Sequence, residues 1–249
     1  MVHYLVCPAY GHRDLMEKAI ASVCRTVKRS DIKFLIKYND PEIEHKPEGF
    51  TKALNDLLKI AYDDKYMESV TVIATDVEIV TSDWLTKILE YVKDKPDVGM
   101  VAPFEYLLSD DCALLPYSGV RKTLGASNNK PEELVYPIFA MVWISKDCLR
   151  TVGLLDEAFS PGSYDDFDYA VRAKLEGFKT MWFPDVIYKH IRGATIGPLV
   201  QAGIYEYPSK QAEYFYKKWK DYLFEGMPAK QALETLEVLR DKNYEVKSR

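Results

Sequence analysis

The sequence predicts an α/β protein with a mixed, mainly parallel sheet flanked by helices, and with a helical extension at its C-terminal end. Three observations support this prediction. Short apolar runs alternate with amphipathic helical stretches, polar turns follow the apolar runs, and a helical region rich in aromatic and basic residues comes last. A chain of 249 residues can form one large domain with an appendage, so we expect a main domain at 1–205 and an extension at 206–249.

The first part of the chain is expected to alternate between strands and helices. Its strands are short apolar runs, expected at residues 2–7, 32–38, 70–74 and 98–102. Pro8 and Pro103 are expected to end the first and fourth of them, and the turn Asn39-Asp40-Pro41 the second. Helical spacing of apolar residues predicts helices at 14–27, 49–61 and 82–92. This alternation implies parallel strands, whose carboxyl ends form the ligand-binding edge of such a sheet.

The second part of the chain is less regular. Residues 104–136 are expected to form a long irregular loop, which in a compact domain is usually functional. Strand patterns follow at 137–144, 180–183 and 186–190, and a helix is expected at 165–176, closed by Gly177. From Pro208 onward the pattern is helical, in two segments divided near Gly226-Met227-Pro228.

Composition excludes some function classes. The net charge is −5 and the pI is about 5.5, which argues against a nucleic-acid binder with a broad basic face. The four cysteines are dispersed without a C-x-x-C motif, so we expect buried free thiols in a reducing compartment. The sequence enters a strand at Val2 without a basic leader, and no apolar run approaches membrane-spanning length. A cytoplasmic location is the expectation.

The acidic cluster in residues 160–168 is the strongest sign of chemistry. Asp165, Asp166 and Asp168 fall within four residues at the start of a predicted helix. A helix N-terminus tolerates negative charge, but capping needs only one such residue. Because like charges this close repel, their collection indicates a functional use. Asp168 is expected to cap the helix or orient it through Arg172.

A second group of ionisable residues follows two other predicted strands. If residues 76–78 are extended, the carboxylates of Asp76 and Glu78 point the same way and offer oxygen ligands for Mg²⁺ or Mn²⁺. An acidic loop end in solvent is the alternative. His190 ends a strand, where a histidine is either a hydrogen-bonded structural residue or a ligand.

Four segments of the chain resemble, in order, the motifs of one enzyme family. Gly49-Phe50 with Asn55 is similar to its N-x-G-[FY]-[AS]-x-[AG]-x-N stretch, without the first Asn. Residues 75–103 are similar to its "NNDV … WL … VGxVxP" block, residues 152–172 to "VGxFDExF … YxEDxDLxxR", and residues 177–195 to "GY … P … HxxGxS/T". This is the pattern of GT-A-type glycosyltransferases, in the large inverting family that includes rhamnosyltransferases. The resemblance covers roughly residues 2–200.

The resemblance implies a GT-A fold that binds a nucleotide-diphosphate sugar and a divalent metal (Mn²⁺ or Mg²⁺). It implies transfer to an acceptor hydroxyl by single displacement with inversion. Asp76 matches the carboxylate that meets the metal, and His190 the histidine that completes the metal site. The Asp165–Asp166 pair matches the acid that acts as base on the acceptor, with Asp166 favoured and Asp165 as its rival. Mutual repulsion within the cluster is expected to raise the pKa of the base toward neutrality.

The resemblance also assigns residues to the donor nucleotide. Pro8, Ala9 and Tyr10 match the first loop, where base and ribose lie. Asn39 and Asp40 match the second-strand acid that reads the base, and Thr75 joins Asp76 on the donor side. The acceptor, whether a glycan, a lipid-linked sugar or a protein, is not specified, and neither is the oligomeric state.

Two departures from the family pattern keep other interpretations open. The turn Asn39-Asp40-Pro41 stands in place of the family's "DNxS", which leaves the choice of the base-reading residue open. Ala74 stands where the family often carries Asp or Asn, so a ligand is absent there or Glu78 substitutes for it. An inactive GT-A-like binding or scaffold module is the main alternative, and a nucleotidyltransferase is a weaker one.

The aromatic and basic residues 212–220 either contact a membrane at its surface or pack against the main domain.

Overall fold

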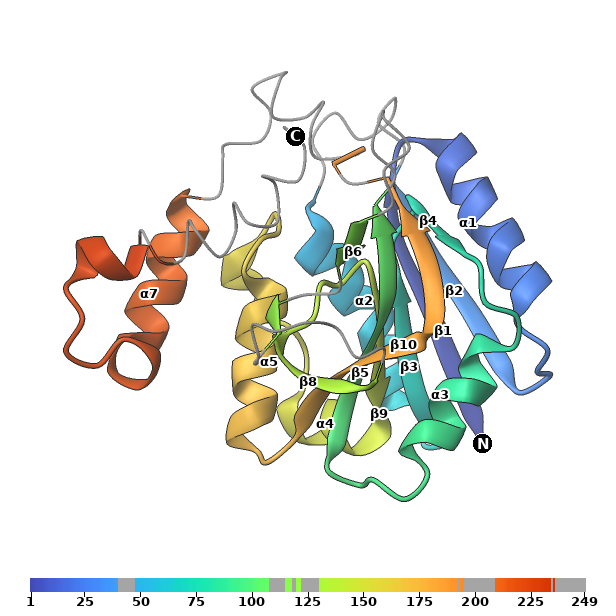
Figure 1. The fold of residues 1–249 in the computed structure, drawn as a ribbon. Coiled ribbons are helices and arrows are strands. Elements are labelled where there is room, and N and C mark those ends of the chain that lie inside the picture. The colour runs from blue at the N-terminus through green and yellow to red at the C-terminus, as the bar shows by residue number, and fades with distance from the viewer. Residues whose placement is uncertain are drawn as a thin grey trace.

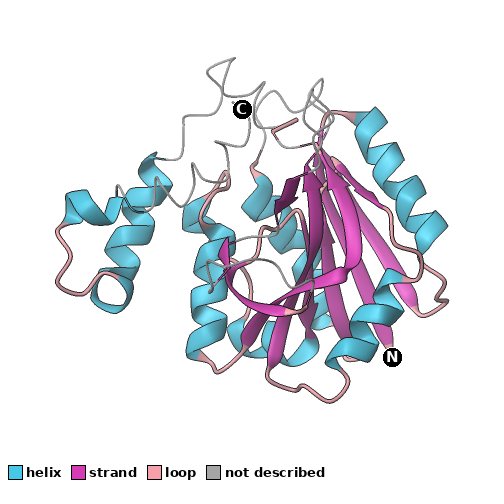
Figure 2. Ribbon diagram, viewed as in Figure 1, coloured by secondary structure: helices cyan, strands magenta, loops and turns pink. Residues whose placement is uncertain are grey.

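The computed structural model describes residues 1–39, 48–107, 115–117, 120–121, 130–191, 193–194, 209–233 and 235. Its centre is one mixed sheet with helices on both faces (Figures 1 and 2). The strands are β1 (Val2–Tyr10), β2 (Ile32–Asn39), β3 (Met67–Ile73), β4 (Val77–Ile79), β5 (Val98–Leu107), β6 (Leu115–Tyr117), β7 (Val120–Arg121), β8 (Glu132–Tyr136), β9 (Met141–Ser145) and β10 (Lys179–His190).

The order of the strands explains the mixed character of the sheet. They run β2-β1-β3-β9-β5-β10-β8-β7, with β4 paired to β10 and β6 paired to β5. β1 is parallel to β2 and β3, and β10 is parallel to β5. β9 lies antiparallel between β3 and β5, so the five longest strands all run in one direction. The predicted α/β class with a mixed, mainly parallel sheet is confirmed.

Apolar faces on the helices bury the two sides of the sheet. On one side lie α1 (Arg13–Thr26) and α3 (Trp84–Val92), whose Val23, Trp84 and Ile88 share a core cluster with β3 and β9. On the other side lie α2 (Phe50–Asp63), α4 (Lys146–Val152) and α5 (Asp165–Leu175). Leu54, Leu57, Leu58 and Ala61 of α2, at the helical spacing seen in the sequence, are all buried there.

Neither proline predicted to end a strand does so. β1 continues through Pro8 to Tyr10, and β5 continues through Pro103 to Leu107. β1 pairs with β3 only as far as Val6, and β5 pairs with β9 only as far as Val101. Beyond Val6, the side of β1 that faced β3 makes no ladder hydrogen bonds, and the same holds beyond Val101 for the side of β5 that faced β9. A strand tolerates proline at such an unpaired position, because proline has no N–H to donate.

The second half of the chain contains more regular structure than its pattern predicted. The expected loop at 104–136 includes the end of β5 and the strands β6 to β8; its remaining residues lie outside the described part of the chain. The strand expected at 137–144 is β9, and α4, which follows it directly, was not predicted. The two expected short strands near the end form one strand, β10, with a register shift between Phe183 and Ile187.

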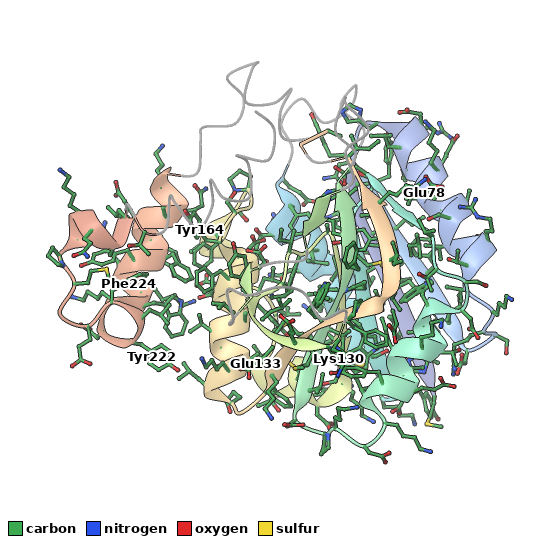
Figure 3. All side chains as sticks on the ribbon, in the orientation of Figure 1. Glu78, Lys130, Glu133, Tyr164, Tyr222 and Phe224 are labelled. Carbon is green, nitrogen blue, oxygen red and sulfur yellow. The ribbon has the colours of Figure 1, made fainter. Side chains whose placement is uncertain are left out.

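The helical extension packs on the main domain. In α7 (Ser209–Leu223), Phe215 is fully buried, and its ring lies 4.6 Å from that of Phe167 and 5.6 Å from that of Tyr164 on the α5 side. Figure 3 shows Tyr164 at the start of α5 and Phe224 after α7. The aromatic side of residues 212–220 therefore packs into the core, which agrees with the alternative that this segment packs against the main domain. None of the described helices is long and apolar enough to cross a membrane.

The cysteines partly follow expectation. Cys7, Cys24 and Cys148 are all free thiols. Cys7 and Cys148 are buried, and burial raises the pKa of each thiol to about 12. Cys24 is exposed on α1, so the expectation of burial is wrong for it. Cys112 lies outside the described residues.

Candidate functional site

The candidate site lies at the edge of the sheet where the parallel strands end, at the top of Figure 1. β1 ends there at Tyr10, β3 at Ile73 and β10 at His190, and α5 begins at the same edge with Asp165. Parallel strands all begin at one edge of the sheet and end at the other. The loops that follow them therefore all lie at this edge, and the crossover connections lead the chain back to the opposite edge. Residues distant in the sequence meet here for that reason.

Asp76 and His190 come into contact at this edge. The Asp76 Oδ1 atom lies 3.2 Å from His190 Nε2. β4 pairs antiparallel with β10, with Val77 opposite His190, and the Ile191 N–H donates to the Asp76 carbonyl at 3.0 Å. The short antiparallel ladder thus holds the turn after β3 against the end of β10, and fixes the two side chains together.

A third ionisable side chain, Glu105 of β5, completes this cluster. Its Oε1 lies 2.7 Å from His190 Nδ1, and its Oε2 accepts a hydrogen bond from the Tyr188 hydroxyl at 3.3 Å. Glu105 is fully buried and His190 is 8 % exposed. Burial would lower the pKa of His190, but the Asp76 and Glu105 carboxylates outweigh it and raise the pKa to about 9.

The donor set around His190 suits a hard or borderline divalent cation. Asp76 offers a carboxylate oxygen and His190 an imidazole nitrogen, close enough to share one ion. Among the described residues, no three His, Cys, Asp or Glu side chains are grouped so that they could hold a metal by themselves. A cation at Asp76 and His190 would therefore need its other ligands from water or from a bound phosphate.

The second half of the site is the acidic pair at the start of α5. Asp165 is buried and accepts a hydrogen bond from the Thr51 hydroxyl at 2.9 Å, whereas Asp166 is half-buried. Burial and then the charge of Asp165 raise the pKa of Asp166 to about 8. Burial also raises the pKa of Asp165. This is the direction expected for two carboxyls that share a desolvated site.

The loop before α5 is held tightly against α2. The Phe50 N–H donates to the Pro161 carbonyl at 2.6 Å, and Gly49 has φ +97°. A Cβ at Gly49 would lie 2.4 Å from Pro161 Cα, so only glycine permits this approach. The close approach carries Thr51 to Asp165, which explains how a motif on α2 belongs to the same site as the acidic pair.

Residues 139–140 connect the two halves of the site. The backbone of Phe139 interacts with the Asp166 carboxylate and acts to lower its pKa, and the Ala140 carbonyl accepts from the Ala74 N–H at 2.7 Å. Ala74 lies two residues before Asp76. The acidic pair and the Asp76–His190 pair are therefore joined through one short segment at the same edge of the sheet.

The residues predicted to hold the donor lie at this edge with varied exposure. Pro8, Ala9 and Thr75 are buried, and Tyr10 is half-buried at the end of β1. Asn39 is buried, and its side-chain amide donates to Glu48 Oε1 at 2.9 Å. Asp40 lies outside the described residues.

Glu78 does not join the Asp76–His190 pair. Its carboxylate lies 3.3 Å from Arg25 of α1 and 3.8 Å from Lys189. Figure 3 shows Glu78 on the α1 side of the molecule. The expectation that Glu78 shares a site with Asp76, or replaces a ligand at position 74, is wrong, because Asp76 lies in the turn while Glu78 lies in β4.

Asp168 serves structure, as expected. It is fully buried, and it contacts Arg172 at 2.9 Å, Lys218 at 2.7 Å and the Trp219 indole N–H at 2.9 Å. Lys218 also contacts Asp156 at 2.7 Å. This network joins α7 to α5 immediately behind the acidic pair.

Replacement of Asp168 by Asn should lower the free energy of unfolding by about 3 kcal/mol, because it removes a fully buried carboxylate that pairs with the half-buried Arg172 and Lys218, of which only Lys218 keeps another carboxylate, Asp156. Urea unfolding followed by circular dichroism measures the change. Lys217→Ala is the matched control on α7, because its ion pair with Glu213 is exposed, and we expect a change under about 0.5 kcal/mol. Equal effects in the two variants would contradict this account of the network.

Three residues of the site were missed from the sequence. Glu105, Thr51 and Glu48 reach it only through strand pairing or through the contact of α2 with the α5 loop. A single signal was present for one of them: Glu105 is an acid within an otherwise apolar strand pattern. Nothing in the sequence distinguished the other two from ordinary surface residues.

Comparison with known proteins identifies the fold. No family model matches the sequence, and no curated protein matches it. Among solved structures, the chain is similar to GalNAc-T7 crystallised with UDP, GalNAc and Mn²⁺, with a TM-score of 0.63 and 15 % identity over 97 % of this chain and 54 % of that one. It is also similar to A197 from STIV, with a TM-score of 0.52 and 16 % identity over 77 % of this chain and 86 % of that one.

These matches show a GT-A fold and confirm that part of the resemblance. The chain spans about half the length of the GalNAc-T7 chain. Membership of the branch that includes rhamnosyltransferases stays a prediction, because structural similarity at 15 % and 16 % sequence identity supports a shared fold and nothing finer.

Proposed function

We propose that this protein is a metal-dependent glycosyltransferase that moves a sugar from a nucleotide-diphosphate donor to an acceptor hydroxyl, with inversion. The observation that supports it best is the meeting of Asp76 with His190 at the ligand-binding edge of a GT-A fold, joined through residues 139–140 to the Asp165–Asp166 pair. One half of this arrangement suits a cation and a diphosphate. The other half suits an acceptor hydroxyl.

The donor half would be formed by Asp76, His190 and the ends of β1 and β2. Asp76 and His190 would hold Mn²⁺ or Mg²⁺, which when bound supplies Lewis-acid stabilisation of the leaving diphosphate. Residues 8–10, Asn39, Asp40 and Thr75 would contact the nucleotide. GalNAc-T7, solved with UDP, GalNAc and Mn²⁺, is the fold neighbour that suggests such a donor.

The acceptor half would be formed by the acidic pair. Asp166 is half-buried and its pKa is raised to about 8, so its carboxylate can accept a proton from a hydroxyl near neutral pH. The acceptor oxygen bonds to the anomeric carbon, the bond from that carbon to the diphosphate breaks, and the hydroxyl proton passes to Asp166. Asp165, buried against Thr51, would raise the basicity of Asp166 through its charge. The acceptor itself would be a glycan, a lipid-linked sugar or a protein.

One observation favours the alternative of an inactive binding module. Ala74 packs beside the apolar cluster under α1 and α3, so position 74 supplies no ligand to the cation site. A module of this kind would bind nucleotide without turnover, or would bind none.

Thermal unfolding with Mn²⁺ and a panel of nucleoside diphosphates separates these alternatives. A ligand at about 100 times its Kd stabilises the native state by about 2.7 kcal/mol, which for a chain of this size corresponds to a rise in Tm of several degrees. We expect one nucleoside diphosphate to give this shift with Mn²⁺ and to lose most of it in Asp76→Asn. A panel without any shift would contradict nucleotide binding and leave the scaffold alternative.

Donor hydrolysis and product stereochemistry complete the test. The nucleotide that stabilises the protein is offered as its sugar derivatives, and we expect Mn²⁺-dependent release of the nucleoside diphosphate from one of them. The anomeric configuration of the transferred sugar, measured by proton NMR, should be opposite to that of the donor. A product with the donor configuration would contradict direct displacement with Asp166 as base.

A further inference from the structure

Glu105 has no part in the chemistry described above, although it is one of the most buried acids in the described structure. Its side chain is fully buried on β5. β5 and β10 run parallel with Glu105 opposite Tyr188. Tyr188 and His190 are two residues apart on one strand and therefore share a face. Two neighbouring strands thus fix Glu105 against both side chains.

The contacts of Glu105 distinguish the two nitrogens of His190. Glu105 Oε1 lies 2.7 Å from Nδ1, while Nε2 faces Asp76 at 3.2 Å. An ionised carboxylate only accepts hydrogen bonds, so Nδ1 must carry a proton to make this contact. Because Glu105 keeps the proton on Nδ1, Nε2 is the nitrogen that gives up its proton when a cation binds, and Nε2 is the nitrogen directed at Asp76.

The second oxygen of Glu105 is also held. It accepts the hydroxyl of Tyr188 at 3.3 Å, and Tyr188 is itself 1 % exposed. A buried carboxylate is costly to desolvate unless its oxygens are hydrogen-bonded, and here both oxygens have a partner. The arrangement restricts rotation of the carboxylate and, through it, of the imidazole ring.

We infer that Glu105 is a positioning residue that holds the His190 ring with its Nε2 lone pair available to a divalent cation shared with Asp76. The inference rests on the proposed metal site at Asp76 and His190. It assigns Glu105 a role outside the ligand set, acting through the histidine, and Tyr188 a supporting role through Glu105.

The test is direct binding of Mn²⁺ alone to the 249-residue chain, without any sugar transfer. Electron paramagnetic resonance measures free Mn²⁺ during a titration. We expect Glu105→Gln to weaken Mn²⁺ binding by about 10- to 100-fold, and its midpoint of thermal unfolding in the absence of metal is measured alongside to show that the variant is folded. Glu78→Gln is the matched control, because its carboxylate pairs with Arg25 and Lys189, and it should bind as wild type does.

The outcomes separate this inference from the proposed function. Wild-type affinity in Glu105→Gln would overturn the role of Glu105 and leave the metal site intact. Failure of the wild-type protein to bind Mn²⁺ would overturn the metal site and this inference with it. If Glu105→Gln does not fold, Tyr188→Phe is measured in its place. It should weaken binding several-fold, and unchanged affinity would again overturn the inference.

A spectroscopic readout checks the nitrogen assignment. The chain has four histidines, so ¹⁵N spectra of histidine-labelled protein loaded with diamagnetic Zn²⁺ can be assigned with His190→Gln. We expect His190 to show a protonated Nδ1 and a metal-bound Nε2 in the wild type, and a loss of this pattern in Glu105→Gln. Metal bound at Nδ1 in the wild-type protein would overturn the inference.

Discussion

Replacement of Asp166 by Asn is expected to lower the turnover number for sugar transfer by about 10²- to 10⁴-fold, the range that loss of a general base produces. The side chain keeps its size and its place at the start of α5, so binding of the donor should change little. Asp166 is half-buried, whereas Asp165 is buried with one oxygen held by Thr51, which leaves Asp166 the better placed to meet an acceptor. Initial rates at saturating donor measure the effect.

The pH dependence of the same reaction gives an independent check. The base must be deprotonated, and the pKa of Asp166 is raised to about 8 by burial and by the charge of Asp165. The rate at low substrate should therefore rise with pH and level off above about pH 8. Asp165→Asn removes the neighbouring charge, so the pKa of Asp166 should fall and the rise should move to lower pH.

The two variants also separate the two carboxylates. If Asp165 is the base, Asp165→Asn abolishes turnover and Asp166→Asn does not. Near-normal turnover in Asp166→Asn, with the donor site intact by thermal stabilisation, would remove Asp166 from the mechanism. An unchanged pH profile in Asp165→Asn would show that the charge of Asp165 does not set the basicity of Asp166.

Loss of a metal-binding side chain is the other large effect. Asp76→Asn and His190→Gln should each lower the rate of donor cleavage by about 10²- to 10³-fold, because Lewis-acid stabilisation of a leaving group contributes several kcal/mol and each 1.36 kcal/mol is a factor of ten. Chelation of divalent ions should abolish the activity of the wild-type protein, and added Mn²⁺ should restore it. The assay is release of the nucleoside diphosphate as a function of Mn²⁺ concentration.

Glu78→Gln is the control for these two variants. It removes a carboxylate near Asp76 in sequence, but its partners are Arg25 and Lys189. Its Mn²⁺ dependence should match that of the wild type. Full activity of Asp76→Asn in the presence of a chelator would rule out a metal role for this site.

The sequence predicted the fold class because its periodicity reports burial on each element. Leu54, Leu57 and Leu58 recur at helical spacing and are buried on α2, and the apolar run from Val70 is buried in β3. The errors fell where pairing between strands decided the outcome. Pro8 and Pro103 did not end their strands, because each lies past the point at which one neighbouring strand stops pairing.

Residue chemistry by itself indicated the acidic cluster with Asp165 and Asp166 as a candidate site, because like charges gathered this closely are costly without a use. It left Asp76 and His190 open, and their assignment as metal ligands came from the family resemblance. Only the tertiary structure brought Asp76 to His190 and turned Glu78 away to Arg25. It alone introduced Glu105, whose place beside His190 depends on the parallel register of β5 and β10. The sequence determines which side chains lie on the same face of a helix or strand. Hydrogen bonding between strands that are distant in the sequence determines which of these side chains come into contact, and the candidate site consists of such contacts.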